Sequence, residues 1–482
     1  MNYSQRFSLA VSLFLFSTIS FAQLSLPPVF SDNMVLQRNK PVVVWGKAKA
    51  GELVIVEFAG QHKSIVADSL GHWQLWLDAM NTSAQPKDFH VQASSEITYK
   101  NVLVGDVWLC SGQSNMEYPL DRKWKKYTAP KKGEDLAEKE LANINKPDAI
   151  RYLYVERTLK KQPELPSKGW FKGTDTTVRF LSAIGYFFAK EIYEQTHIPI
   201  GIISSSWGGT RIEQWIPDWA YQQSSVFKDS TTKPDFKIDG MHPGQMFNGM
   251  IQPMLPLTIK GILWYQGESD LMIHDHVTYP AKFKLFADTW RSLFKDENLP
   301  LYYVQIAPFL YTTRKDHIPH TPQTLSEFWE TQSKSLELPN TGMVVTTDLV
   351  DDLSNIHPSY KWVVAHRLAL IALAKLYGKK KLVYQGPVYE SMKVNSQSVE
   401  LSFANVAGGL KSSDGKPLSW FTIAGEDGNF VPANAEIKGK KIIVSSPEIT
   451  VPKYVRFAWD EKAQPNLINK EDLPAAPFRT GK

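Results

Sequence analysis

The chain has 482 residues, of which 43% are hydrophobic, 12% aromatic and 21% charged. This length corresponds to about two to four domains with hydrophobic cores, and the 15 tryptophans and the 28 glycines without a period exclude a disordered, collagen-like or coiled-coil chain. A net charge of +5, from 54 Lys and Arg against 49 Asp and Glu, is a small excess, so no nucleic-acid partner is expected.

The first 22 residues have the pattern of a cleaved secretory signal peptide. Arg6 supplies the positive charge, residues 7–19 form the apolar stretch, and Ser20 and Ala22 are small residues before a cleavage site after Ala22. The apolar stretch is short for a membrane-spanning helix. We therefore expect a secreted or periplasmic protein with no membrane attachment after cleavage.

Residues 23–100 are predicted to form an N-terminal β-sandwich-like domain. Apolar residues alternate with polar ones in residues 54–58 and 73–77, which indicates half-buried strands, and glycines separate these runs. Several short strands at this spacing are typical of a small sandwich.

Residues 101–380 are predicted to form an α/β domain. A strand at 150–155, a helix capped by Ser182 and a strand at 198–203 make a strand–helix–strand unit, which implies a parallel sheet. Further strands are expected at 261–265, 301–306 and 343–347, and a further helix at 363–377. Residues 381–482 return to short alternating strands and are predicted to form a C-terminal β-rich region.

Ligands bind at the carboxyl ends of strands in open parallel sheets, so the polar loops after predicted strands form the candidate site. Ser114 lies in the first such loop, after an apolar strand at 107–110, and its hydroxyl is a candidate nucleophile or a helix cap. In the second loop, Gly208 and Gly209 allow backbone N–H groups to approach a ligand oxygen. Arg211 comes shortly after them and is expected to shape the pocket or to pair on a helix surface.

The third and fourth loops carry an amide, several carboxylates and a histidine. Gln266 offers a neutral donor for a developing oxyanion, whereas Glu268 and Asp270 could be general acids or metal ligands. No further ligand lies at metal-like spacing, so no metal is expected. His357 comes after several carboxylates, which is typical of a general base with an orienting acid.

The chain carries, in this order, the segments GDVWLCSGQSNME (105–117), SWGGTRIEQW (206–215), KGILWYQGESD (260–270) and IHP (356–358). Together they resemble the sialate O-acetylesterase family of the SGNH-type hydrolases. The resemblance implies a flavodoxin-like α/β catalytic domain with a parallel sheet, flanked by β-rich regions. It also implies removal of O-acetyl groups from sugars such as sialic acids, with no metal and no organic cofactor.

The same resemblance assigns roles to the residues of the four loops. Ser114 becomes the nucleophile and His357 the base. The backbone N–H of Ser114, an N–H of Gly208 or Gly209, and the side chain of Gln266 form the expected oxyanion hole.

The sequence does not decide which acid, if any, orients His357. SGNH-type enzymes commonly carry an aspartate three residues before the histidine, where this sequence has Ser354. Asp352 is our first candidate. The alternatives are Asp351, Asp348 or a Ser–His dyad in which a backbone carbonyl orients the ring.

The sequence therefore predicts a sialate 9-O-acetylesterase that acts through a serine acyl-enzyme, with Glu268 and Arg211 as expected substrate-binding residues. One alternative keeps the chemistry and changes the substrate to xylan, pectin or another acetylated glycan. Another is a carbohydrate-binding protein on an inactive hydrolase fold. An O-acetylated sugar is the expected partner in the first two cases, and the sequence does not set the oligomeric state.

Overall fold

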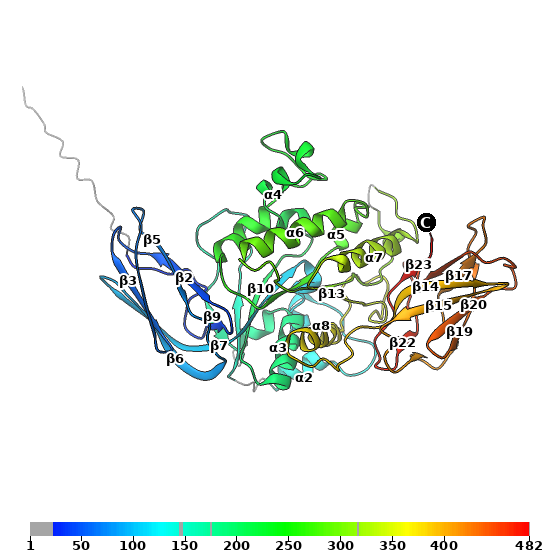
Figure 1. The fold of residues 1–482 in the computed structure, drawn as a ribbon, viewed down its shortest axis with the longest axis horizontal. Helices are drawn as coiled ribbons and strands as arrows, with labels where there is room; N and C mark the ends of the chain where they lie inside the picture. Colours follow the sequence, from blue (N-terminus) through cyan, green and yellow to red (C-terminus); the bar gives the residue numbers. More distant parts are fainter. Residues whose placement is uncertain (1–22, 144–147, 174–175, 316–317, 482) are drawn as a thin grey trace, which may run out of the picture.

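The computed structural model describes residues 23–143, 148–173, 176–315 and 318–481. The predicted signal peptide, residues 1–22, lies outside these ranges. Figure 1 shows three parts along the chain: a β-rich N-terminal part, a central α/β part and a β-rich C-terminal part. In the described ranges, no helix combines the length and the apolar composition needed to cross a bilayer.

The N-terminal part consists of short strands, as predicted. Trp73, Leu75 and Leu77 are buried while the residues between them are exposed, so this strand places one face on the core. The strands are β1 (Val35–Gln37), β2 (Val42–Lys47), β3 (Leu53–Phe58), β4 (Gln61–Val66), β5 (His72–Leu77) and β6 (Ser83–Gln92). β2 pairs with β5, and β3 pairs with β4 and β6, all antiparallel.

A single long strand, β7 (Glu96–Gly112), joins the N-terminal part to the central sheet. Its first half pairs antiparallel with β6, and its second half pairs in parallel with β10 and β11. The predicted boundary at residue 100 therefore lies inside a strand, and one continuous hydrophobic core runs from Leu24 to Leu373. The turn after β7 is consequently anchored by both parts.

The central sheet has the strand order β13-β12-β11-β7-β10-β8-β9. All neighbours pair in parallel except β8 and β9, which are antiparallel. The strands added here are β8 (Ile150–Tyr154), β9 (Trp170–Lys172), β10 (Ile200–Ser206), β11 (Gly261–Tyr265), β12 (Leu301–Val304) and β13 (Thr341–Val344). Gly112 lies in register with both Ser206 and Tyr265, so the carboxyl ends of three strands meet at one place.

Helices cover both faces of this sheet, with α5, α6 and α7 on one face and α3 and α8 on the other (Figure 1). The helices are α1 (Ser114–Glu117), α2 (Leu136–Ala142), α3 (Ala183–Thr196), α4 (Asp218–Gln223), α5 (Glu268–Leu271), α6 (Tyr279–Leu293), α7 (Thr324–Lys334) and α8 (Lys361–Leu376). The Ser182 hydroxyl accepts a hydrogen bond from the Gly185 N–H at 3.2 Å and caps α3, as predicted. The predicted fold class, a parallel α/β sheet with β-rich flanks, is confirmed.

The C-terminal part has a hydrophobic core of its own. Its two larger sheets are antiparallel, with the orders β14-β15-β20-β19 and β18-β17-β21-β23. The strands are β14 (Val388–Asn395), β15 (Ser398–Ala404), β16 (Leu410–Ser412), β17 (Phe421–Ala424), β18 (Val431–Pro432), β19 (Asn434–Lys438), β20 (Lys441–Ser445), β21 (Tyr454–Phe457), β22 (Leu467–Asn469) and β23 (Phe478–Arg479).

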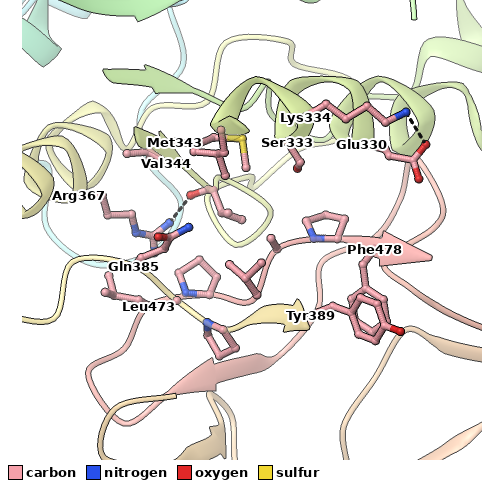
Figure 2. A pocket seen from close by; sticks show the side chains of 18 of the residues that line it. Glu330, Ser333, Lys334, Met343, Val344, Arg367, Gln385, Tyr389, Leu473 and Phe478 are labelled. Carbon is pink, nitrogen blue, oxygen red and sulfur yellow. Dashed lines mark hydrogen bonds and ion pairs between the residues drawn. The ribbon is translucent and has the colours of Figure 1, made fainter. Parts of the chain in front are cut away.

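A cavity of about 510 Å³ lies where the C-terminal part meets α7 and β13 (Figure 2). On one side, the rings of Tyr389 and Phe478 stack with their centroids 4.6 Å apart. On the other, Glu330 forms ion pairs with Lys334 at 3.5 Å and Arg479 at 3.0 Å. These charged groups at its wall thus pair with one another, and none of the predicted site residues lines this cavity.

Candidate active site

A tight turn places Ser114 at the carboxyl edge of the sheet. Gly112 has φ +133°, and a Cβ at this position would lie 2.2 Å from the carbonyl oxygen of Tyr265. Glycine therefore lets β7 and β11 approach closely where β7 ends. The Gln113 N–H donates to that Tyr265 oxygen at 2.9 Å, and α1 begins at the next residue, Ser114.

The turn after β10 lies directly against Ser114. The Trp207 N–H donates to the Gly112 carbonyl at 3.0 Å, and a Cβ on Gly208 would lie 3.1 Å from the Ser114 Cβ. Ser114 and Gly208, which the sequence analysis assigned to one oxyanion hole, are thus neighbours in the structure. The Gly208 N–H, however, donates to the Glu117 carboxylate at 2.9 Å in this structure.

Ser114 and His357 line the same cleft, which has a volume of about 640 Å³. His357 lies in the loop between β13 and α8, and its ring packs against Tyr127 with the centroids 4.8 Å apart. Burial, together with the positive charges of Lys361 and Lys125, lowers the pKa of His357 to about 4. The imidazole is therefore neutral at pH 7.

The predicted contact between Asp352 and His357 is not formed. The Asp352 carboxylate accepts hydrogen bonds from the backbone N–H of Ser354 at 2.9 Å and from its hydroxyl at 2.6 Å. It also lies 3.7 Å from the ammonium group of Lys131. Asp352 is exposed, and local turn bonding rather than the imidazole holds its carboxylate.

The two alternative acids also have other partners. Asp351 accepts a hydrogen bond from the Tyr360 hydroxyl at 2.7 Å, and Asp348 forms an ion pair with Arg367 at 2.6 Å. Within the described residues, no carboxylate forms a hydrogen bond or an ion pair with the His357 ring. Of the alternatives left open by the sequence, the dyad is the one that needs no carboxylate, although the described residues show no backbone carbonyl bonded to the ring either.

Gln266 is fully buried and does not line the cleft. Its amide nitrogen donates to the Thr210 carbonyl and the Gln113 amide oxygen, both at 3.3 Å, and to the Asp270 carboxylate. Its amide oxygen accepts from the Tyr279 hydroxyl at 3.3 Å. These partners engage the whole amide in the interior, so the structure does not place Gln266 where the oxyanion-hole prediction requires it.

The two predicted substrate-binding residues differ in position. Glu268 is buried below the cleft, where its carboxylate accepts a hydrogen bond from the Asn115 side chain. Burial raises the pKa of this carboxyl group. Arg211 does line the cleft, and its guanidinium donates to the backbone carbonyl of Asp239 at 2.7 Å.

Three carboxylates, from Glu213, Asp239 and Asp275, lie close enough together to hold a metal ion. The ammonium group of Lys282 lies among them, 2.7 Å from Glu213 and 2.6 Å from Asp275, and also pairs with Asp239. Burial alone lowers the pKa of Lys282, but the charges of Glu213 and Asp275 raise it above its ordinary value. The cluster is therefore a buried ion-pair network.

Several residues that line the cleft were not identified from the sequence. Glu117 lies within the GQSNME segment, where its place one turn after Ser114 was the available signal. It pairs with Lys125 at 2.7 Å and with Arg157. The others come from segments without a motif, and the lining residues missed are Glu117, Lys125, Tyr127, Arg157, Met241, Met272, Ile273 and Arg314.

Comparisons with known proteins show which family this chain belongs to. The sequence model of the family described as carbohydrate esterase, sialic acid-specific acetylesterase, matches residues 104–369, more than half of the chain. Sialate O-acetylesterases from Pongo abelii and Homo sapiens are 30% and 29% identical over 399 residues, which cover 76% of this chain and 73% of each of theirs. The crystal structure of a carbohydrate acetylesterase from Xanthomonas citri is 33% identical, with a TM-score of 0.83, and covers 95% of this chain and 100% of the other.

Proposed function

This chain belongs to the sialic acid-specific acetylesterase family of carbohydrate esterases, and we propose that it removes O-acetyl groups, most readily the 9-O-acetyl group, from sialic acids. The observation that carries this proposal is the common cleft of Ser114 and His357. The Ser114 turn is held by three strand ends, and the imidazole across the cleft is neutral.

In the proposed mechanism, His357 takes the proton of the Ser114 hydroxyl while the oxygen attacks the acetyl carbonyl carbon. The sugar oxygen then leaves with that proton from His357, which yields an acetyl-enzyme. Water attacks this ester, gives its proton to His357, and acetate is released as Ser114 regains a proton. A pKa of about 4 keeps His357 in the neutral form that the first step requires.

We propose the backbone N–H groups of Ser114 and Gly208 as the oxyanion donors. Ser114 is the first residue of α1, where backbone N–H groups lack helical acceptors. Because Glu117 accepts the Gly208 N–H in the present structure, the substrate carbonyl gains this donor only when the Glu117 carboxylate moves. The Ser114 N–H needs no such change.

The charge of the cleft supports an acidic sugar as the substrate. Its lining includes four cationic side chains, and Glu117 is the one carboxylate among the described lining residues. Glu117 pairs with Lys125 and Arg157, so positive charge remains in excess in the lining. Sialic acids carry a carboxylate at neutral pH, and an excess of positive charge attracts such a ligand. The cationic side chains are Lys125, Arg157, Arg211 and Arg314.

The test is acetate release from 9-O-acetylated sialic acid by the mature protein and by Ser114→Ala. We expect the variant to lose turnover by about 10⁴-fold or more. Ser354→Ala removes a nearby hydroxyl that bonds only Asp352 and is the matched control. Release that persists in Ser114→Ala would refute the serine mechanism.

An acetylated xylan and a small aryl acetate distinguish the alternative functions. Release from the xylan but not from the sialic acid would replace the sialate assignment and keep the esterase. Silence on all three substrates, with sugar binding retained, would identify a carbohydrate-binding protein.

A further inference from the structure

We propose that Asn115 is a positioning residue that holds the His357 loop against the Ser114 turn, with Lys361 and Glu268 fixing the orientation of its amide. The inference rests on the proposed function, in which Ser114 and His357 react. It concerns a neighbour of each of these residues rather than the reacting groups themselves.

Three hydrogen bonds define the arrangement. The Asn115 amide nitrogen donates to the Ile356 carbonyl at 3.0 Å and to the Glu268 carboxylate. The Lys361 ammonium donates to the Asn115 amide oxygen at 2.6 Å. Because acceptors face the nitrogen and a cation faces the oxygen, only one orientation of this amide satisfies its partners.

The contact between Asn115 and Ile356 matters because each residue is next to a reacting residue in the chain. Asn115 directly follows Ser114, and Ile356 directly precedes His357. One side chain therefore connects the backbone beside the nucleophile to the backbone beside the base. A misplacement of about 1 Å between reacting groups can cost about 10²-fold in rate.

The residues of the network are buried, and buried polar groups are costly unless they bond to one another. Asn115 is fully buried, and Glu268 and Lys361 are each 1% exposed. The Lys361 ammonium lies over the rings of Tyr118 and Tyr265, 4.8 and 5.5 Å from their centroids. The Asn115 amide is bonded at its nitrogen and at its oxygen, whereas the second carboxylate oxygen of Glu268 has no hydrogen-bond partner among the described residues. The Asn115 amide is therefore the part of the network that specifies one arrangement.

The charge of Lys361 gives the network a second effect on His357. Lys361 on α8 and Lys125 beside the cleft both carry positive charges that disfavour the imidazolium form. The Tyr127 ring packs against the imidazole, and the further charged groups that line the cleft are Glu117, Arg157, Arg211 and Arg314. Removal of the Lys361 charge should therefore raise the pKa of His357.

The first experiment measures kcat and KM for Asn115→Ala and Asn115→Asp with the acetylated substrate. Aspartate keeps an oxygen for Lys361 but has no N–H for the Ile356 carbonyl. We expect both variants to lose about 10²-fold in kcat with KM within about threefold of wild type, because distance between the reacting groups changes and the cleft does not. Asn469→Ala, a buried asparagine in the C-terminal part, is the control for loss of a buried amide.

The second experiment is the pH profile of kcat/KM for Lys361→Met. The acid limb reports the pKa of the base in the free enzyme, and we expect it to move up by about one pH unit. Lys375→Met, on the same helix but bonded to the Thr341 carbonyl at 3.0 Å, should leave the limb in place.

The outcomes separate this inference from the proposed function. If Ser114→Ala stays active, the proposed function fails and Asn115 has no pair to position. If Ser114→Ala is inactive while the Asn115 variants keep wild-type kcat, or the Lys361→Met limb does not move, the inference is wrong. It is equally wrong if activity falls only together with a drop of about 10 °C or more in melting temperature, since that result indicates a role in folding alone.

Discussion

Two buried lysines on opposite faces of the central sheet show how differently one residue type is used in this molecule. Lys282 on α6 pairs with three carboxylates, whereas Lys361 on α8 meets one amide oxygen and two tyrosine rings. Burial lowers the pKa of Lys282, but the charges of its carboxylates outweigh this effect and raise the pKa above its ordinary value. Burial dominates at Lys361 and lowers its pKa to about 7, although the charge of Glu268 acts in the opposite direction.

The lysine is fully paired in one of these regions and has few partners in the other. The Lys282 region lies beside the buried Gln266 amide and pairs its ammonium group with three carboxylates, which suits a structural role. In the other region, the Lys361 ammonium near His357 has few partners. Its burial in the charged form lowers the stability of the fold. Imbalance of this kind is expected where a buried group acts on the chemistry of a neighbour.

Removal of the Lys282 charge should produce the largest change in stability. Lys282→Met would leave Asp239 and Asp275 without their cation and Glu213 with Arg211 alone, at 3.5 Å. Breaking a buried ion pair typically costs about 3–5 kcal/mol. We expect a loss of that size in urea unfolding followed by tryptophan fluorescence, since Trp264 and Trp290 lie in the same core.

Lys284→Met is the matched control on the same helix. Lys284 is exposed and pairs only with Asp288, so its loss should change the unfolding free energy by less than about 0.5 kcal/mol. Equal effects of the two substitutions would show that the Lys282 cluster is not a stabilising network.

The contribution of Lys361 to stability should instead depend on pH. Its pKa is about 7 in the folded protein and near 10.5 in the unfolded chain. Between these values the unfolded state binds more protons, so stability rises with pH through this window. The unfolding free energy of wild type minus that of Lys361→Met should rise by up to about 1.4 kcal/mol per pH unit. From pH 7 to pH 9 this amounts to a rise on the order of 2–3 kcal/mol.

The same titration on Lys282→Met gives the contrast. The raised pKa of Lys282 means that its contribution is fully present at pH 7 and is lost only as pH rises through the folded-state pKa, above the ordinary lysine range. The difference between wild type and Lys282→Met should therefore stay flat from pH 7 to pH 9. A flat difference for Lys361→Met as well would remove the distinction between the two lysines.

Gln266→Ala tests whether Gln266 has a structural role, as Lys282 does, or a direct role in the reaction. Its amide bonds only interior groups, so the substitution removes one hydrogen-bond partner each from Asp270 and Tyr279 and should cost about 1–3 kcal/mol in unfolding free energy. We expect kcat to fall by less than about tenfold. A direct oxyanion donor would give about 10²–10³-fold, and that result in a stably folded variant would restore its predicted role.

Strand order made part of the site predictable from the sequence. Ser114, Gly208 and His357 each come after a parallel strand, and parallel strands end at one edge of a sheet, so their loops had to converge. The fold class could be predicted from the same alternation of strands and helices. The boundary at residue 100 could not be predicted, because β7 continues through it as one paired strand.

The direction of a side chain within a loop was beyond the sequence. Gln266 and Glu268 come after β11 as site residues should, but the turn at Gly267, with φ +146°, leads into α5 with both side chains in the interior. Their burial depends on distant partners such as Tyr279 and Asn115. Of the described cationic residues that line the cleft, Arg211 lies in a recognised segment, whereas Lys125, Arg157 and Arg314 come from segments without a periodic or motif signal.

Among the substitutions within the two lysine regions, Glu268→Gln should change stability least, and Glu213→Gln is its counterpart in the Lys282 region. Glu268→Gln keeps an oxygen that can accept from Asn115, and burial already raises the pKa of Glu268 toward the neutral form. Its unfolding free energy at pH 7 should therefore change by less than about 1 kcal/mol, with no loss or a slight gain. Glu213→Gln takes a partner from Lys282 and should destabilise. Urea unfolding of both variants at pH 7 distinguishes the two cases. If Glu268→Gln loses as much unfolding free energy as Glu213→Gln, Lys361 depends on a carboxylate as strongly as Lys282 does. The contrast between the two lysines would then disappear.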